Sequence, residues 1–208
     1  MPDFRHEKSC EGPVAGIDEA GRGPLAGPVV AAAVIVHAKR CPRGCRGRID
    51  DSKQLAIEAR EAAFDALIAA ARAGDLVFAI GAASVREIDR INILQATFLA
   101  MRRALARLPS PPARVLIDGD RIPPGLGCAA TTLIGGDALA FSIAAASILA
   151  KVTRDRAMRR LAHRHPGFAW DTNMGYATAD HLQGIGALGP TRHHRLSFAP
   201  CAQGRLGF

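Results

Sequence analysis

Aromatic residues are scarce in this chain of 208 residues, which contains eight Phe, one Tyr and one Trp. A protein that binds nucleic acid on stacking platforms needs several aromatic side chains to contact successive bases. The composition therefore argues against that class of nucleic-acid-binding protein. The single Trp is Trp170 and the single Tyr is Tyr176.

Long apolar runs are also missing, because no stretch reaches the ~18 residues that a membrane-spanning helix needs. The first eight residues carry charges with no apolar segment behind them, so they do not resemble a secretory signal. We therefore expect no membrane association and a cytoplasmic location. With 49% hydrophobic and 22% charged residues, the chain has the composition of one folded globular domain.

Cysteine is too infrequent for a disulfide framework, since a chain of this length contains only five. The number is also odd, so not all of them could pair. Cys41 and Cys45 have a spacing that could begin a zinc site. No second Cys or His pair follows at a suitable distance. We expect free thiols.

Lysine provides only four of the 27 basic residues, and the rest are arginine. Residues 1–100 hold 13 basic and 13 acidic residues, whereas residues 101–208 hold 14 basic and six acidic. The net charge of +8 therefore lies entirely in the second half of the chain. Because arginine makes forked contacts to phosphate, this favours nucleic acid as a partner. The alternative is a solvated, arginine-rich surface.

Hydrophobic periodicity predicts an α/β sheet with a helical C-terminal addition. Short apolar runs between glycines predict strands, and apolar residues at helical spacing predict helices, the first of them with Ser52 as its N-cap. The predicted strands cover residues 13–20, 27–37, 75–82, 115–118 and 128–134, and the predicted helices cover 52–72, 91–108, 138–165 and 178–188.

Four carboxylates, Asp18, Glu19, Asp118 and Asp137, each lie beside glycine at a predicted strand or loop end. In open α/β sheets, ligands bind outside the strand ends. Neighbouring residues on a regular strand face opposite sides, so Asp18 and Glu19 share one site only if the strand bends there. The glycines that follow make such a bend possible.

Clustered carboxylates repel one another by about 4 kcal/mol per pair at ~4 Å and an effective dielectric near 20. Such a cluster requires protons or cations, and oxygen ligands favour Mg²⁺ or Mn²⁺. Together with the basic half, this suggests two-metal hydrolysis of a phosphodiester. The alternative is a set of unrelated solvated acids at turns, and spacing alone does not decide between the two.

The segment Gly16-Ile-Asp-Glu-Ala-Gly-Arg-Gly-Pro-Leu-Ala-Gly-Pro28 resembles the opening motif of type-2 ribonuclease H, also called ribonuclease HII. The resemblance covers about residues 14–200 in order. Further matching motifs lie at residues 51–55, 91–96, 116–119, 136–137, 142–155, 175–176, 178–181 and 195–200.

The resemblance implies a ribonuclease H-like fold, with a central mixed five-stranded sheet flanked by helices and a helical extension from about residue 156. Residues 1–13 would be an N-terminal extension, 14–200 the catalytic domain and 201–208 a tail. It also implies an endonuclease that cuts the RNA strand of RNA–DNA hybrids and the 5′ side of single ribonucleotides in duplex DNA. The products would carry 5′-phosphate and 3′-hydroxyl ends.

For the active site, the resemblance implies that Asp18, Glu19, Asp118 and Asp137 are catalytic and bind metal. The cofactor would be Mn²⁺ or Mg²⁺, with two cations during catalysis.

For the substrate, Gly21, Arg22 and Gly23 match a loop whose backbone reads the ribose 2′-hydroxyl, where glycine permits close approach. Lys53 matches a phosphate contact, and Tyr176 matches a tyrosine that packs on the sugar at the RNA–DNA junction. Without the surrounding motifs, these residues would be interpreted as a tight turn, a solvated lysine and a packing residue.

The chain departs from the family pattern at Asp120, where Asn is common, and at Gly135 and Leu139, which replace lysines. We expect a weaker phosphate grip beside Asp137, for which arginines in the helix after Lys151 could compensate. Residues 193–195 (His-His-Arg) would either approach phosphate or form a solvated basic loop.

The last six residues, Gln203-Gly-Arg-Leu-Gly-Phe208, resemble peptides that dock on bacterial sliding clamps, although a frayed tail is the alternative. We expect a monomer. Two other functions stay open: a type-3 ribonuclease H, which usually lacks arginine in the glycine loop and has a larger N-terminal domain, and a nucleic-acid-binding protein that has lost catalysis.

Overall fold

The structure is a computed structural model that describes residues 1–37, 49 and 56–203. The predictions for Cys41, Cys45, Ser52 and Lys53 lie outside these residues, as does the 203–208 motif from residue 204 onward. Within them, five strands form one sheet in the order β3-β2-β1-β4-β5. The strands are β1 (Val14–Ala20), β2 (Val29–Val36), β3 (Leu76–Ala83), β4 (Arg114–Asp118) and β5 (Ala129–Leu133).

The sheet is mixed, as predicted. β1 pairs with β2, and β2 with β3, in antiparallel fashion, whereas β1, β4 and β5 are parallel. All five predicted strands are present, with ends shifted by one or two residues. The order places β1 in the centre, next to β4, although about a hundred residues separate them in the sequence.

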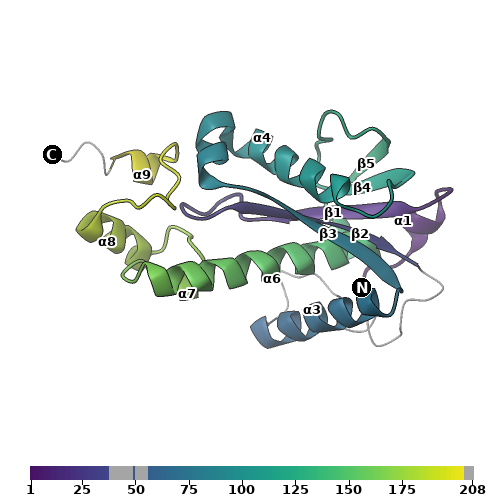
Figure 1. The fold of residues 1–208 in the computed structure, drawn as a ribbon, viewed down its shortest axis with the longest axis horizontal. Coiled ribbons are helices and arrows are strands. Elements are labelled where there is room, and N and C mark those ends of the chain that lie inside the picture. The colour runs from purple at the N-terminus through teal and green to yellow at the C-terminus, as the bar shows by residue number, and fades with distance from the viewer. Residues whose placement is uncertain (38–48, 50–55, 204–208) are drawn as a thin grey trace.

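Helices cover both faces of the sheet and make three layers (Figure 1). α4 (Val85–Ala106) packs on one face, and α6 (Phe141–Arg164) with α3 (Ile57–Arg72) packs on the other. α6 approaches β1 closely because Gly16 has no side chain, and a Cβ there would collide with the Ser142 backbone. This contact fixes α6 directly beneath the strand that carries Asp18.

Two predicted helices differ from the observed ones. The predicted 52–72 helix begins at Ile57 within the described residues, where Ala56 is the N-cap and has no side-chain capping bond. The predicted 91–108 helix is the second part of α4, which is kinked at Asn92 (φ 65°, ψ 167°). Ser84 and Glu87 form a capping box that starts the first part, a signal the periodicity did not include.

The predicted 138–165 helix is two helices, α5 (Gly136–Leu139) and α6, separated by Ala140 in an extended conformation. The break has a tertiary cause, because Ala140 forms a parallel bridge with Asp3. In the same N-terminal segment, α1 (Arg5–Lys8) brings Glu7 to the start of α6, where its carboxylate accepts hydrogen bonds from the Ser142 N–H and hydroxyl (2.8 and 2.7 Å).

The C-terminal helices lie beyond one end of the sheet (Figure 1). They are α7 (Trp170–Asn173), α8 (Ala179–Leu188) and α9 (Ala199–Gln203). They pack around the buried Trp170 together with the end of α6, which runs through residue 156 without a break. Within the described ranges, no helix combines the length and hydropathy needed to cross a membrane.

Candidate active site

The carboxylates of β1 and β4 lie at one end of the sheet. The parallel register pairs Ile17 with Ile117, so Asp18 and Asp118 occupy the next position on adjacent strands. Asp118 accepts a hydrogen bond from the Gly136 N–H (2.8 Å), which brings Asp137 in α5 to the same end. We call Asp18, Glu19, Asp118 and Asp137 the acidic cluster.

Asp18 is strongly perturbed by its surroundings. Its side chain is buried, and Oδ2 has no hydrogen-bond partner among the described residues. Burial raises the pKa of Asp18 well above its usual range, and the charges of Glu19 and Asp118 raise it further. Hydrogen bonds from the Ser147 side chain and the Glu19 N–H oppose the shift only in part.

Glu19 points to the other face of the sheet. β1 pairs with β2 without interruption from Ala15 to Ala20, so the strand does not bend at Asp18 and Glu19, the condition under which both would face one side of the sheet. Glu19 instead lines a small cleft of about 30 Å³ together with Asp118 and residues of α4. The cluster therefore forms around the end of the sheet, since Asp118 ends β4 and is reached from both faces.

The oxygen-only composition of the acidic cluster fits a hard divalent cation. The orphaned Oδ2 atom of Asp18 is a buried anionic oxygen that such an ion would satisfy. Across the described part of the chain, no three His, Cys, Asp or Glu side chains are already arranged as a metal-binding group.

The glycine loop, residues 21–27, follows β1 and lies beside Tyr176. A Cβ built on Gly23 would lie 3.7 Å from Cε1 of the Tyr176 ring. Gly21 has a φ of +98°, and a Cβ there would collide with the Arg154 side chain, so other residues are excluded at this position. The structure thus brings together the predicted loop and the predicted tyrosine, whose side chain is 46% exposed.

Comparison with known proteins identifies the family. The sequence model of ribonuclease HII matches residues 15–201. The chain belongs to the ribonuclease HII family. A ribonuclease HII from Granulibacter bethesdensis is 56% identical over 198 residues, which cover 95% of this chain and 89% of the relative.

Solved structures agree with this assignment. The ribonuclease H2 from Pyrococcus horikoshii has a TM-score of 0.75 and 26% identity, covering 93% of this chain and 97% of that one. A PCNA–ribonuclease HII complex from Archaeoglobus fulgidus gives a TM-score of 0.71 and 25% identity, covering 89% and 95% of the two chains. Ribonuclease HII is an endoribonuclease, and membership of this family confirms the predicted enzyme class and the prediction of type 2 over the type-3 alternative.

Two arginines of the basic second half are buried. Arg195 is fully buried, and its guanidinium donates to the carbonyls of Gly21, Arg22 and Gly27. Arg154 in α6 is also buried and donates to three carbonyls, those of Pro28, Met174 and Ala26.

The expectation that residues 193–195 approach phosphate or form a solvated loop was wrong for Arg195. Arg154 belongs to the helix whose arginines could compensate for the missing lysines, and its burial removes it from that set. Burial favours hydrogen bonds from each guanidinium nitrogen to acceptors inside the protein. Sequence reasoning missed both residues as supports of the site, although each lies within a motif of the family resemblance.

His194 is buried as well and forms a chain with His181 and Trp170. Trp170 Nε1 donates to His181 Nε2 (2.8 Å), so His181 carries its proton on Nδ1 and donates to the Tyr176 carbonyl (2.8 Å). The Thr191 N–H donates to His194 Nδ1 (2.9 Å), which leaves the His194 proton on Nε2, facing His181 at 3.1 Å. Burial, and then the neighbouring His181, lowers the pKa of His194 to about 4.

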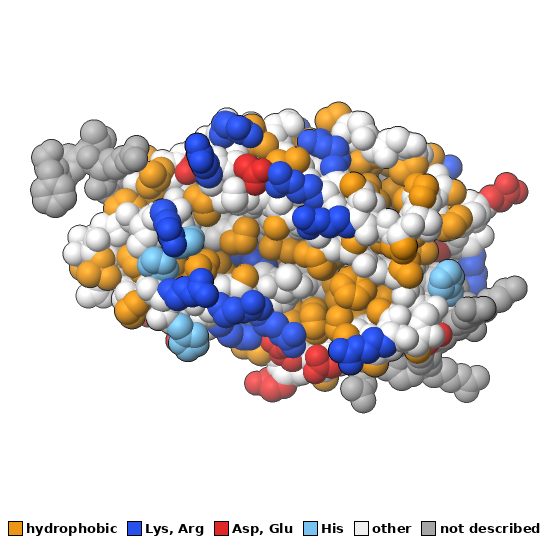
Figure 2. All heavy atoms as spheres, viewed as in Figure 1, with side chains coloured by type: hydrophobic (Ala, Val, Ile, Leu, Met, Phe, Trp, Pro, Cys, Tyr) orange, Lys and Arg blue, Asp and Glu red, His pale blue; other side chains and the backbone are white. Residues whose placement is uncertain are grey.

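The basic excess of the second half does not form a surface of its own. Figure 2 shows Lys and Arg gathered over α4 and along α6, on either side of a band of exposed hydrophobic side chains. Along α6, Arg156 and Arg159 form ion pairs with Glu61 of α3 (2.6 and 3.1 Å), and Lys151 pairs with Asp155. Two arginines of the second half are therefore paired with a carboxylate of the first half and are not free on the surface.

The three departures from the family pattern lie at the surface near the acidic cluster. The Asp120 side chain is 73% exposed and lies 4.0 Å from Arg121, so solvent screens its added charge. Gly135 adopts the left-handed conformation (φ 66°) directly before α5, and Leu139 is exposed. Neither position offers a cation beside Asp137.

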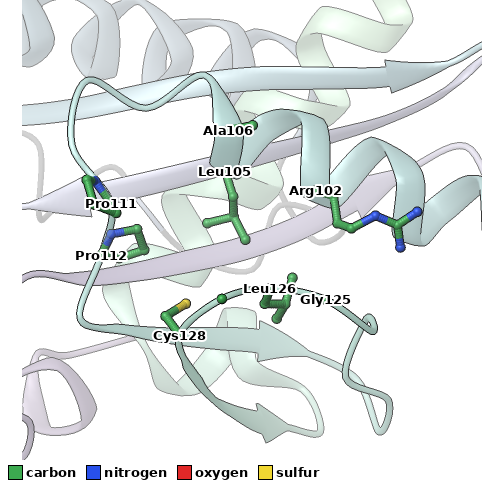
Figure 3. Close-up of a pocket in the computed structure, with 9 residues that line it drawn as sticks. Arg102, Leu105, Ala106, Pro111, Pro112, Gly125, Leu126 and Cys128 are labelled. Carbon is green, nitrogen blue, oxygen red and sulfur yellow. The ribbon is translucent and has the colours of Figure 1, made fainter.

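A separate pocket of about 290 Å³ lies between α4 and the β4–β5 connection. Figure 3 shows Leu105 projecting from α4 toward the loop that carries Leu126, whereas Arg102 points away. No carboxylate lines this pocket among the described residues, and burial raises the pKa of its Cys128 thiol, which disfavours the reactive thiolate. It is not part of the active site.

Proposed function

We propose that this ribonuclease HII hydrolyses the RNA strand of RNA–DNA hybrids and incises the 5′ side of single ribonucleotides in duplex DNA. The observation that carries the proposal is the burial of Asp18 beside Glu19 and Asp118, with its pKa raised by burial and by their charges. A fold tolerates such repulsion where the carboxylates serve a ligand.

Asp18, Glu19, Asp118 and Asp137 would hold two divalent cations, Mg²⁺ or Mn²⁺. Cations in such a site lower the pKa of bound water and stabilise the charge that develops on the leaving oxygen. The protein fixes the positions of the carboxylates, because Asp18 and Asp118 lie on adjacent parallel strands and the Gly136 N–H orients Asp118. The products would carry 5′-phosphate and 3′-hydroxyl ends.

The neighbouring glycine loop and Tyr176 would recognise the ribonucleotide. The free backbone edge at Gly23 admits a sugar close to the chain, and the half-exposed Tyr176 ring offers an apolar face beside it. A 2′-hydroxyl is the group that distinguishes RNA from DNA at one position. Lys53, outside the described residues, would add a phosphate contact.

The decisive experiment is incubation with a duplex that contains one ribonucleotide, in the presence of Mg²⁺, Mn²⁺ or EDTA. We expect cleavage on the 5′ side of the ribonucleotide with a divalent cation and none with EDTA. An all-DNA duplex of the same sequence is the negative control. Absence of cleavage with both metals, on this duplex and on a long hybrid, would refute the proposed function.

We also propose that residues 203–208 bind a sliding clamp. The support is the resemblance of this tail to clamp-binding peptides, together with the solved complex of PCNA with the Archaeoglobus fulgidus enzyme. A calorimetric titration of the bacterial clamp with the full chain and with a chain lacking residues 203–208 tests this. Equal affinities of the two chains for the clamp would show that the tail does not bind it.

A further inference from the structure

Arg195 contacts the glycine loop through every part of its guanidinium. Nη2 donates to the carbonyls of Gly21 (2.5 Å) and Gly27 (2.9 Å), Nη1 to that of Arg22 (2.8 Å), and Nε again to that of Gly27 (3.1 Å). Its backbone N–H donates to the carbonyl of Leu25 (2.8 Å). A fully buried cation thus directs all of these bonds to a single loop.

These bonds determine the direction of two amide groups in the loop. In a trans peptide the C=O and N–H point in opposite directions, and the described residues contain no cis peptide. Holding the carbonyl of Gly21 therefore directs the Arg22 N–H away from the guanidinium, and holding the carbonyl of Arg22 does the same for the Gly23 N–H. Among the described residues, neither N–H has a hydrogen-bond acceptor.

We infer that Arg195 is a positioning residue for recognition of the ribose 2′-hydroxyl. It aims the N–H groups of Arg22 and Gly23 at the space beside Tyr176, where a sugar oxygen can accept from them. The inference rests on the proposed function, because it names the residue that prepares the ribose-reading loop. Arg195 itself is buried and acts only through the backbone.

The position requires arginine. Three carbonyls at different places in one loop match the planar fork of a guanidinium, whereas the ammonium of lysine is a single point donor. The fork is itself held in place, since its Cζ atom lies 5.2 Å from the centre of the Phe198 ring. The following residues are fixed by Asp89, whose carboxylate accepts from the N–H groups of Leu196 (3.1 Å) and Ser197 (3.0 Å).

The test compares Arg195→Lys with Arg192→Lys, which changes an exposed arginine in the same segment. Both are made in an Asp118→Asn background, so that the substrate is not consumed. Fluorescence anisotropy gives the affinity for a duplex with one ribonucleotide and for the all-DNA duplex, and the ratio of the two affinities is the readout. We expect Arg195→Lys to lower this ratio about tenfold, with DNA affinity within about twofold, and Arg192→Lys to leave it unchanged.

An unchanged ratio in Arg195→Lys, with discrimination intact in the parent, would overturn the inference and leave the proposed function standing. The proposed function would instead be overturned by two results together. The Asp118→Asn parent would bind both duplexes equally, and the chain with Asp118 restored would not cleave the ribonucleotide-containing duplex. If circular dichroism shows that Arg195→Lys does not fold, Phe198→Leu decides. That variant keeps the guanidinium but removes the ring beside it, so a lower ratio supports the inference and an unchanged ratio refutes it.

Discussion

The acidic cluster and the glycine loop lie next to each other but handle buried charge in opposite ways. Asp18 is a buried carboxyl group beside other acidic side chains, with one oxygen that has no partner in the described chain. Arg195 is a buried cation among carbonyl oxygens that accept from every nitrogen of its guanidinium. One charge is left for a ligand to satisfy, and the other is satisfied by the protein.

This difference separates groups that act on substrate from groups that shape the site. Burial lowers the pKa of Arg195 to about 9, yet the group keeps its proton at neutral pH and remains a fixed donor. Burial raises the pKa of Asp18, and a bound cation would restore the carboxylate to its charged form. A strongly shifted pKa therefore marks a ligand site only where the hydrogen-bond partners are incomplete.

The largest effect is expected for Asp118→Asn, which removes one anionic oxygen of the acidic cluster. Turnover should fall by about 10³-fold or more, because the variant can no longer hold the cations that stabilise the transition state. Binding to an RNA–DNA hybrid should persist. Single-turnover kinetics and a binding titration check this, with the exposed Asp120→Asn as matched control; near-normal turnover would remove Asp118 from the mechanism.

Acid should weaken the region that supports Tyr176. The pKa of His194 is lowered from 6.5 to about 4, so the unfolded chain binds a proton in this window and the folded chain does not. The contribution of His194 to the free energy of unfolding is therefore fully present above pH 6.5. It is lost as pH falls toward 4, by about 3 kcal/mol.

Urea unfolding between pH 4 and 7 measures this loss. His194→Gln should flatten the pH dependence, and the exposed His163→Gln should not. An equal slope in His194→Gln would show that another group is responsible.

Tyr176→Ala tests the substrate side of the glycine loop. Loss of the ring should reduce cleavage at isolated ribonucleotides about tenfold, comparable to the loss of one stacking contact. Cleavage of a long hybrid, which offers many registers, should fall less. The ratio of the two rates is the measurement, and an unaltered rate at isolated ribonucleotides would mean that Tyr176 only packs.

The smallest effect on stability is expected for Asp18→Asn, which should stabilise the fold. Because the pKa of Asp18 is raised in the folded state, its contribution to stability is greatest below pH 3.8 and is lost as pH rises through the folded value. At neutral pH in EDTA, the free energy of unfolding of the variant should be about 1–2 kcal/mol higher than that of the parent. Its melting temperature should be about 2–8 °C higher.

Mn²⁺ should raise the melting temperature of the parent but not of Asp18→Asn. A parent that is already more stable than Asp18→Asn in EDTA would contradict the idea of a strained carboxylate.

Much of the fold could be predicted from local patterns. The apolar run of β2 and the buried run that ends at Asp118 have the period and composition of strands, and both are strands. The ends of helices were less predictable where tertiary contacts set them. Ala140 interrupts the 138–165 pattern because Asp3 pairs with it, and no residue near Ala140 signals that bridge.

The sequence by itself determined which residue types are available for chemistry, the class of the fold and the family to which the motifs point. Only the tertiary structure decided which charges meet. Asp18 and Asp118 are a hundred residues apart and become neighbours through parallel pairing, whereas Asp18 and Glu19 are adjacent and face opposite sides of the sheet. The basic sequence around Arg195 suggests a solvated side chain. Its role instead follows from its burial, which only the packing of the folded chain determines.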